Sequence, residues 1–438
     1  MNQYPIRGSD ASEIAATTER ALAAGALNPG QQLPTVRALA AHLKVSPATV
    51  AAAYRTLRLR GIIRGSGRRG TMINPTPPLV TRSAPAVADN MRNLAGGGPD
   101  PRLLPSLPRD LPRKYSRHSY GEPYNRADLL VLAAQTFEAD GIPHGRIAIT
   151  SGAMDAIERL LQANVRIGDR VALEDPGYPP VLDLVAALGL HAKPLRVDES
   201  GPIPAELNCL LKSGVEAAII TPRAQNPMGA ALDYARAQEL RRVLRSFPRV
   251  MVIEDDHAGP VAGAPAITVC DSQRPRWAIV RSLSKSLGPD LRLALVTGDE
   301  MSIARVEGRQ RLGPGWVSHL LQELVVTLWS DPNTGRLVRK AEERYASRRR
   351  ALVDALTKRK IAAYGRSGLN IWVPVPEEFA VVQSMLAAGW ALSAGERYRI
   401  TSPPAVRISI GTLEPGEAER VAADLAHSLA PHARAHYA

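Results

Sequence analysis

The sequence predicts a mixed α/β protein with a small helical region at its N-terminus and a larger region built on a mostly parallel sheet. The chain has 438 residues, 45% of them hydrophobic, which is long for one core and indicates two or three domains. From about residue 95, short β-rich runs alternate with amphipathic helical stretches, which is the rhythm of βαβ units. Between the two regions, the proline-rich stretch PTPPLVTRSAPAVAD (75–89) is typical of a semi-stiff linker.

The net charge is unevenly distributed along the chain. Residues 1–75 hold ten Lys and Arg against three acidic residues, so this segment contributes +7 of the net +13. A basic segment on a nearly balanced body indicates a polyanionic partner. The sequence has no apolar run of membrane-spanning length, no signal-peptide layout at its start, and only two cysteines, Cys209 and Cys270. We therefore expect a soluble, cytoplasmic protein with no membrane contact and no metal.

Residues 33–61 have the layout of a helix-turn-helix. After a first helix with an apolar stripe, Ser46 is a suitable N-cap and Pro47 takes the first helical position of the second helix. The stretch IIRGSGRRGTMI (62–73) then predicts a two-stranded wing. A solvated basic face on a small helical domain is the alternative, but the wing and the charge asymmetry favour DNA binding. The residues that we expect to contact double-stranded DNA are Arg37, Ser46, Ala48, Thr49, Arg55, Arg58, Arg68 and Arg69.

The second region contains six clear strand candidates. Helical stretches at 153–165 and 233–246 lie between several of them, which predicts helices on both faces of the sheet. A long helical stretch at 331–360 leads to β-rich pieces near 369–375 and 406–413. The six candidates are RIAIT (146–150), RVALED (170–175), EAAIIT (216–221), VMVIED (250–255), WAIVRS (277–282) and LALVTG (293–298).

Polar residues near the ends of these strands match the needs of a bound phosphorylated aldehyde. An aldehyde needs an amine, which Lys285 offers, and a pyridinium nitrogen needs a carboxylate at a strand end, where Asp255 lies. Asn226 and His257 are polar neighbours for a ring hydroxyl, in loops after strands. A phosphate needs backbone N–H groups at a helix start, hydroxyls and an arginine. The candidates for that role are Gly152, Ala153, Met154, Ser282, Ser284 and Arg292.

Each of these residues also has a plainer explanation. A single lysine after a serine is usually a surface residue, Asp255 could be a cap, and His257 could be a loop histidine with satisfied hydrogen bonds. Their order and spacing, taken together, favour the binding site.

The quoted motifs carry two resemblances. Over about residues 10–74, GALNPGQQLPTVRALA, VSPATVAAAYRTL, the break at Gly61 and GRRGT resemble the winged helix-turn-helix of GntR-type regulators, although many members have Arg where Pro47 stands. Over about residues 95–430, the chain resembles fold-type I pyridoxal-phosphate proteins, the aspartate aminotransferase family. As a whole it resembles the MocR subgroup of GntR regulators, and TPRAQNPMG, EDDH and IVRSLSKSLGPDLRLALV resemble its PtsJ branch.

The resemblance implies roles for individual residues. Pyridoxal 5′-phosphate would be the cofactor, held by Lys285 as a Schiff base, with Asp255 on the pyridine nitrogen and Asn226 on the ring oxygen. His257 stands where most relatives have Tyr, and Met228 where they have Thr or Ser. Further implied contacts are Tyr178 stacked on the ring, Tyr120 near the phosphate across a dimer interface, and Ser151, Gly152, Ala153, Met154, Ser282, Ser284 and Arg292 on the phosphate. Arg407 would bind the carboxylate of an amino-acid effector, with a surface strand arginine as the alternative.

The resemblance also implies an organisation. We expect a winged helix-turn-helix at 1–74, a linker at 75–94 and an aminotransferase-like domain at 95–438, whose large part is about 140–330 and whose small part is 95–139 and 331–438. Family members form head-to-tail, domain-swapped homodimers.

The expected function is transcriptional regulation, with pyridoxal phosphate or its amine adduct as effector and vitamin B6-related genes as candidate targets. The alternatives are an active pyridoxal-phosphate-dependent aminotransferase, which sustained turnover with a 2-oxo acid would reveal, and a regulator that has lost its cofactor. The operator, the effector and the direction of regulation stay open.

Overall fold

The structure, a computed structural model, describes residues 5–59, 62–65, 70–74, 87, 91–107 and 118–430. The chain divides into two compact units. The first comprises residues 1–82 and 180–191, and the second comprises residues 83–179 and 192–438. Because most of the predicted linker lies outside the described residues, the linker and the predicted domain boundaries stay a proposal.

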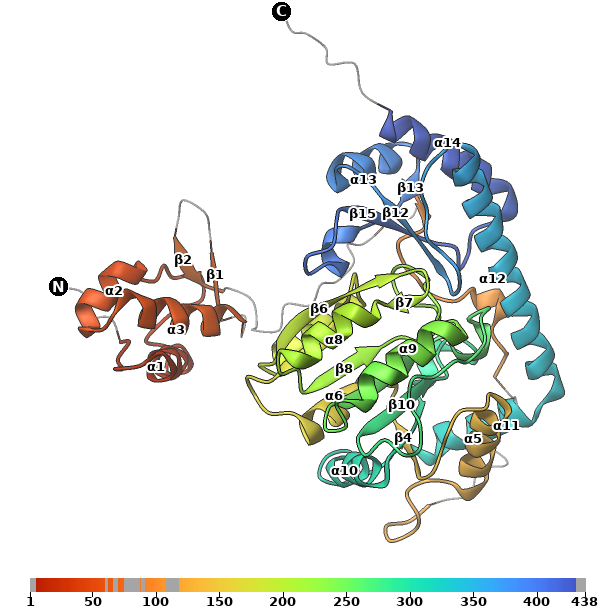
Figure 1. The fold of residues 1–438 in the computed structure, drawn as a ribbon, viewed down its shortest axis with the longest axis horizontal. Helices are drawn as coiled ribbons and strands as arrows, with labels where there is room; N and C mark the ends of the chain where they lie inside the picture. Colours follow the sequence, from red (N-terminus) through yellow and green to blue (C-terminus); the bar gives the residue numbers. More distant parts are fainter. Residues whose placement is uncertain are drawn as a thin grey trace, which may run out of the picture. The chain divides into compact units, whose positions relative to one another are not determined.

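The N-terminal segment of the first unit contains, in its described residues, three helices followed by a small two-stranded sheet (Figure 1). The helices are α1 (Ala11–Ala23), α2 (Val36–Leu43) and α3 (Pro47–Leu59), and the strands are β1 (Ile63–Gly65) and β2 (Thr71–Ile73). The strands pair antiparallel, with Ile63 opposite Ile73. The predicted helix-turn-helix and its wing are confirmed.

Local chemistry explains the boundary between α2 and α3. Lys44 ends α2 in the left-handed conformation, with φ 57°, and Ser46 Oγ accepts a hydrogen bond from the backbone N–H of Thr49 at 3.0 Å, which is an N-cap. The predicted inner face of α3 is buried, and the Tyr54 hydroxyl donates to Pro34 O at 2.8 Å. The buried residues of this core include Leu39, Ala40, Val50, Ala53, Tyr54 and Leu57.

The second unit is built on an eight-stranded sheet in the order β4-β11-β10-β9-β8-β5-β6-β7. Strands β5, β8, β9 and β10 pair in parallel, and β11 is antiparallel to both β10 and β4. The six predicted strands are confirmed, whereas β6 and β7 were not predicted. The bounds are β4 (Ile147–Thr150), β5 (Arg170–Asp175), β6 (His191–Asp198), β7 (Gly201–Pro202), β8 (Ala217–Ile220), β9 (Met251–Asp256), β10 (Trp277–Ser282) and β11 (Ala294–Gly298).

Helices cover this sheet (Figure 1). They are α5 (Ala127–Ala139), α6 (Ala153–Asn164), α8 (Pro204–Lys212), α9 (Tyr234–Arg245), α10 (Glu300–Arg311) and α11 (His319–Ser330), with short 3₁₀ turns η3 (Gly259–Val261) and η4 (Pro289–Leu291). Helix α7 (Pro179–Ala187) lies almost entirely in residues 180–191, which belong to the first unit. Leu129 and Phe137 of α5 belong to the core of this sheet. The packing therefore places α5 with the large part, where the sequence had suggested the small part.

A second, smaller sheet with its own core follows along the chain. The long helix α12 (Pro332–Lys358) leads to β12 (Asn370–Pro374), α13 (Glu378–Ala387), β13 (Trp390–Ala391), β14 (Ser393–Ala394), η5 (Gly395–Tyr398), β15 (Ala405–Ser409), η6 (Pro415–Glu417) and α14 (Ala418–Leu429). Three strands pair in the order β12-β15-β14. The segment after the proline-rich stretch 75–89 joins this part, because β3 (Arg92–Asn93) pairs with β13 and is followed by η2 (Pro101–Leu103).

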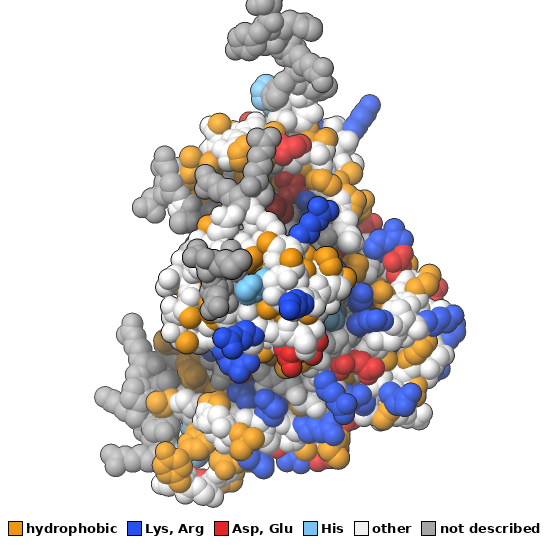
Figure 2. Space-filling model, turned by 90° about the vertical axis from the view of Figure 1, so that its left-hand side faces the viewer, with side chains coloured by type: hydrophobic (Ala, Val, Ile, Leu, Met, Phe, Trp, Pro, Cys, Tyr) orange, Lys and Arg blue, Asp and Glu red, His pale blue; other side chains and the backbone are white. Residues whose placement is uncertain are grey.

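The surface is rich in basic side chains. Figure 2 shows Lys and Arg spread over the described part of one face, with fewer acidic side chains between them, in line with the net charge of +13. Within the described ranges, no helix is long and apolar enough to cross a membrane. The same residues contain no group of three or more His, Cys, Asp or Glu that could hold a metal ion.

Candidate functional site

A cavity of about 210 Å³ lies where several strands of the large sheet end. The carboxyl ends of parallel strands meet at one edge of a sheet, so residues that are distant in sequence converge there. Eleven of the residues predicted from the sequence line this cavity: Ala153, Met154, Tyr178, Asn226, Asp255, His257, Ser282, Ser284, Lys285, Arg292 and Arg407.

Lys285 follows β10, and its side chain is half-buried. Its Nζ donates a hydrogen bond to Gly97 O at 3.0 Å. Burial, together with the nearby positive charge of Arg407, lowers the pKa of Lys285 to about 8. A lysine with a lowered pKa supplies more neutral amine near neutral pH, which is the form that attacks an aldehyde.

Asp255, at the end of β9, is 5% exposed, and its Oδ1 has no hydrogen-bond partner among the described residues. Burial is the largest cause that raises its pKa to about 7, and the neighbouring acids Asp256 and Glu174 add to it. Asp256 differs, because Arg223 and Arg281 donate to its two oxygens at 2.8 and 2.9 Å. A buried carboxyl without a partner is costly unless a ligand pairs with it.

His257 is held by a backbone carbonyl, because its Nε2 lies 2.8 Å from Ala224 O. A carbonyl oxygen can only accept, so Nε2 carries the ring proton and Nδ1 is the acceptor. Burial, with a smaller effect from Lys285, lowers the pKa of His257 to about 4. The imidazole is therefore neutral at physiological pH.

Arg407, on β15, is 4% exposed and reaches the cavity from the smaller sheet. Its Nη1 donates to Asn226 Oδ1 at 3.1 Å, and its Nη2 donates to Ala95 O. Burial lowers the pKa of Arg407. Gly97 has φ +71°, a conformation that favours glycine, and a Cβ there would lie 3.0 Å from Arg407 Nη1.

The start of α6 faces an arginine. Gly152, with φ +95°, precedes α6, and a Cβ at Gly152 would lie 3.3 Å from Arg292 Nη2. Ser282 and Ser284 line the same cavity as Arg292, and the N–H of Ser284 donates to Ser282 Oγ at 3.3 Å. Backbone N–H groups at a helix start, hydroxyls and an arginine suit a phosphate group.

Three predicted residues do not line the cavity, and Gly152, beside Arg292, is one of them. Ser151 is exposed, and its N–H is already used by Asp155 Oδ2 at 2.9 Å. Tyr120 is 93% exposed, with its ring centre 5.7 Å from that of Trp316. Lining residues that the sequence reasoning missed are Gly96, Gly97, Pro289, Leu369 and Asn370. The run of three glycines at 96–98 was the one signal that could have indicated the first two.

The predicted DNA-contacting face of the first unit is largely solvent-accessible. Arg55 and Arg58 of α3 are exposed, as are Arg37, Ser46 and Ala48, and Thr49 is half-buried. The predicted wing-tip residues Arg68 and Arg69 lie outside the described residues.

Comparisons with known proteins agree with this two-part layout. The family model "Aminotransferase class I and II" matches residues 90–425, and "Bacterial regulatory proteins, gntR family" matches residues 10–73. The chain is 38% identical to the vitamin B6 salvage pathway transcriptional repressor PtsJ of Salmonella typhimurium, over 97% of this chain and 99% of that one. It is 27% identical to the pyridoxine biosynthesis transcriptional regulator PdxR of Corynebacterium glutamicum, over 56% of each chain.

Among solved structures, the fold is similar to that of LysN, the α-aminoadipate aminotransferase of Thermus thermophilus. The TM-score is 0.69 at 20% identity, and the match covers 78% of this chain and 92% of that one. The LysN structure contains N-(5′-phosphopyridoxyl)-L-leucine.

The fold and the comparisons together define the class of protein: a GntR-type DNA-binding winged helix-turn-helix and an aminotransferase-like domain in one chain. Aminotransferase class I and II domains typically bind pyridoxal phosphate. The chain belongs to the MocR-type group of GntR-family transcription regulators, and PtsJ is one of its relatives.

Proposed function

We propose that this regulator binds pyridoxal 5′-phosphate covalently at Lys285 and that this binding changes how its winged helix-turn-helix domains engage DNA. The observation that carries the proposal is that Lys285 and Asp255 line the same cavity. One is an amine with a lowered pKa and the other is a buried carboxyl whose Oδ1 lacks a partner among the described residues. A pyridine ring with a protonated nitrogen and an aldehyde complements both groups.

Other residues in and next to the cavity would hold the rest of the cofactor. Arg292, Ser282 and Ser284, with the backbone N–H groups of Gly152, Ala153 and Met154, would hold the phosphate. Tyr178 would cover the ring. Because Asn226 Oδ1 accepts from Arg407, the amide NH₂ is the end of Asn226 that would donate to the ring oxygen. Arg407 would bind the carboxylate of an amine adduct.

Neutral His257 bears on the alternative of an active aminotransferase. Since its Nε2 proton is used by Ala224 O, the imidazole offers an acceptor and not a donor to the cavity. Bound cofactor supplies an electrophilic carbon and an electron sink. A neighbour that cannot donate to the ring oxygen favours binding over turnover.

We propose a head-to-tail homodimer as the DNA-binding form, with Tyr120 reaching the partner's cofactor site. Its high exposure in the single chain supports a contact across an interface. The relation to PtsJ and PdxR supports vitamin B6-related genes as the targets.

The experiment that tests this function is a selection of bound DNA fragments, run with the full-length protein with and without pyridoxal phosphate. We expect a specific site whose affinity or footprint changes with the cofactor. A ligand can shift an equilibrium only through different affinities for two states, so identical binding in both conditions would leave the sensor without support.

The exposed arginines of α3 give a second prediction. Arg55→Ala and Arg58→Ala should each weaken DNA binding. If the arginine contacts a guanine, we expect a loss of about 1–3 kcal/mol in binding free energy. If it contacts a phosphate, the slope of log binding constant against log salt concentration should fall by about one. Fluorescence anisotropy over a salt series measures both effects. Arg196→Ala, which removes an exposed arginine of β6 paired with Glu206, is the control and should bind DNA like the wild type.

A further inference from the structure

The polypeptide that follows the proline-rich stretch 75–89 enters the second unit as residues 91–104, which we call the strap and which include the last residues of the predicted linker. It forms β3, passes through the glycine run at 96–98 and ends in η2. Gly96 and Gly97 line the cofactor cavity. One short segment therefore borders the proposed ligand site and continues, at its N-terminal end, toward the DNA-binding domain.

The two cationic side chains of the cavity hold the middle of the strap. Lys285 Nζ donates to Gly97 O at 3.0 Å, and Arg407 Nη2 donates to Ala95 O. These are the same groups that the proposed function assigns to the aldehyde and to a carboxylate. An imine nitrogen has at most one hydrogen, against three on an ammonium, so covalent attachment at Lys285 weakens or removes its bond to Gly97 O.

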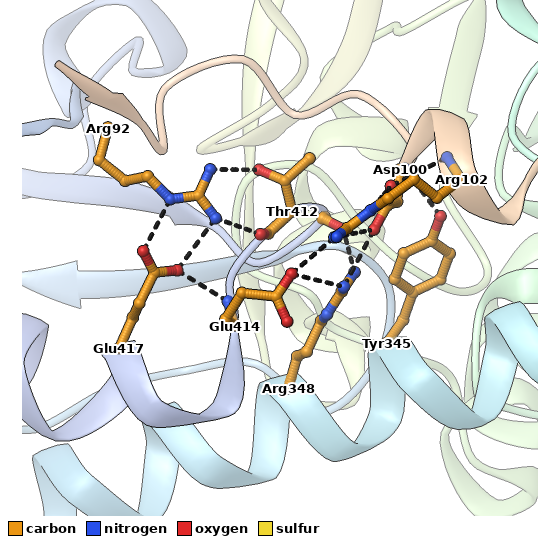
Figure 3. Close-up of polar contacts among 9 residues, drawn as sticks. Arg92, Asp100, Arg102, Tyr345, Arg348, Thr412, Glu414 and Glu417 are labelled. Carbon is orange, nitrogen blue, oxygen red and sulfur yellow. Dashed lines mark hydrogen bonds and ion pairs between the residues drawn. The ribbon is translucent and has the colours of Figure 1, made fainter. Parts of the chain in front are cut away.

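Ion pairs fix the linker end of the strap (Figure 3). Arg92 makes a forked contact with Glu417, with Nε to Oε1 at 2.8 Å and Nη2 to Oε2 at 2.9 Å, and it also donates to Thr412 O. A forked arginine–carboxylate contact defines orientation as well as distance. The position of Glu417 therefore sets where the chain leaves toward the linker.

A second group of contacts fixes the other end (Figure 3). Asp100 accepts from Arg348 and Arg102 at 2.9 Å, its backbone N–H donates to the Tyr345 hydroxyl at 2.9 Å, and Arg102 reaches Glu414 at 2.6 Å. Burial alone would raise the pKa of Asp100, but the hydrogen bonds from Arg102 and Arg348 outweigh it and lower the pKa to about 2. This anchor stays charged at any physiological pH.

The contacts of Arg92 and those of Asp100 both involve the turn at 411–417, so we expect the strap and this turn to move together. The Asp100 anchor contacts Glu414 through Arg102, and Arg348 donates to Gly411 O. At Gly411, a Cβ would lie 2.2 Å from Gly98 O, so the backbones approach as closely as glycine allows. A shift of the glycine run is therefore transmitted to residues 411–417 and from there to the linker end of the strap.

We propose that the strap is the element that couples the ligand cavity to the DNA-binding domain. Ligand attachment replaces the bonds from Lys285 and Arg407 to the strap carbonyls, the strap moves with the 411–417 turn, and the pair Arg92–Glu417 passes that movement to the linker. This inference rests on the proposed function, because it requires a ligand that reacts with Lys285.

The test compares DNA affinity with and without pyridoxal phosphate, using full-length wild type, Arg92→Ala and Glu417→Gln. Allosteric coupling typically changes affinity by about 5- to 150-fold, and we expect both variants to reduce that ratio to within about twofold of one. Absorbance titration should show unchanged cofactor binding, because neither residue lines the cavity. Arg196→Ala is again the control and should keep the wild-type ratio.

A second readout is hydrogen exchange of peptides covering residues 91–104. Cofactor should change exchange there in the wild type and leave it unchanged in Lys285→Ala. Retention of the full ratio in Arg92→Ala, or unchanged strap exchange in protein that has bound cofactor, would overturn the coupling while leaving the proposed sensor intact. If wild-type protein neither binds cofactor nor responds to it, the proposed function falls and the strap mechanism falls with it.

Discussion

Lys285→Ala should abolish covalent attachment of pyridoxal phosphate. After incubation with the cofactor and reduction with borohydride, peptide mass analysis of the wild type should find one pyridoxyl group, on Lys285. The reason is specific to this amine, since burial lowers its pKa to about 8 and it lines the same cavity as Asp255 and Arg292, the phosphate candidate. The variant should also lose the cofactor-dependent change in DNA affinity, so that the ratio falls to about one.

The control for this experiment is Lys212→Ala, which removes a lysine at the exposed end of α8. It should keep both the pyridoxyl modification and the DNA response. DNA affinity without cofactor should be the same in Lys212→Ala and the wild type, because Lys212 lies outside both the helix-turn-helix and the cavity. Modification of the wild type at other lysines, with Lys285 unmodified, would contradict the proposed site.

The site residues that could be predicted from the sequence are those that follow the ends of predicted strands. Asp255 and Lys285 could be placed from sequence because parallel strands end at one edge of a sheet, and the strand candidates before them were unambiguous. The helix-turn-helix was readable for a similar reason, since the cap at Ser46 and the proline at Pro47 are local signals.

The strap was not predictable in the same way. Its function depends on the backbone carbonyls of Ala95 and Gly97, and a carbonyl has no side-chain signature. Ser151 shows the reverse case, since its motif is present but its N–H bonds to the neighbouring Asp155. Strand β6 also escaped prediction, because its sequence, HAKPLRVD, mixes charged residues and a proline.

The Asp255 carboxyl should affect both the stability of the folded chain and its affinity for the cofactor, and the effect on stability should depend on pH. Its pKa is about 7 in the folded chain, against about 4 for an exposed aspartate. Between those values the folded state holds a proton that the unfolded state has released, so this group makes the protein less stable as pH rises from about 4 to 7. The contribution of the protonated Asp255 carboxyl to the free energy of unfolding is therefore complete below about pH 4 and is lost as the pH rises to about 7. A buried charge without a partner thus costs stability at neutral pH, and a bound pyridinium would remove that cost.

Asp255→Asn should therefore have opposite effects on the two properties. Without cofactor, the variant should be more stable than the wild type, with a difference in unfolding free energy that widens by roughly 2 kcal/mol between pH 5 and pH 7 and then levels off. Cofactor affinity should fall roughly 100-fold, since removing one partner of a buried charge pair costs about 2–5 kcal/mol. Denaturant unfolding at several pH values and an absorbance titration measure the two effects.

Asp354→Asn, at an exposed carboxylate of α12, is the matched control and should change neither quantity. A variant that lost cofactor affinity without gaining stability at neutral pH would show that Asp255 is already stabilised in the folded chain. A variant that gained stability but kept wild-type affinity would show that the carboxyl does not contact the cofactor. Only the combined result assigns the unpartnered Oδ1 to the ring nitrogen, because each half separately has a structural explanation that involves no ligand.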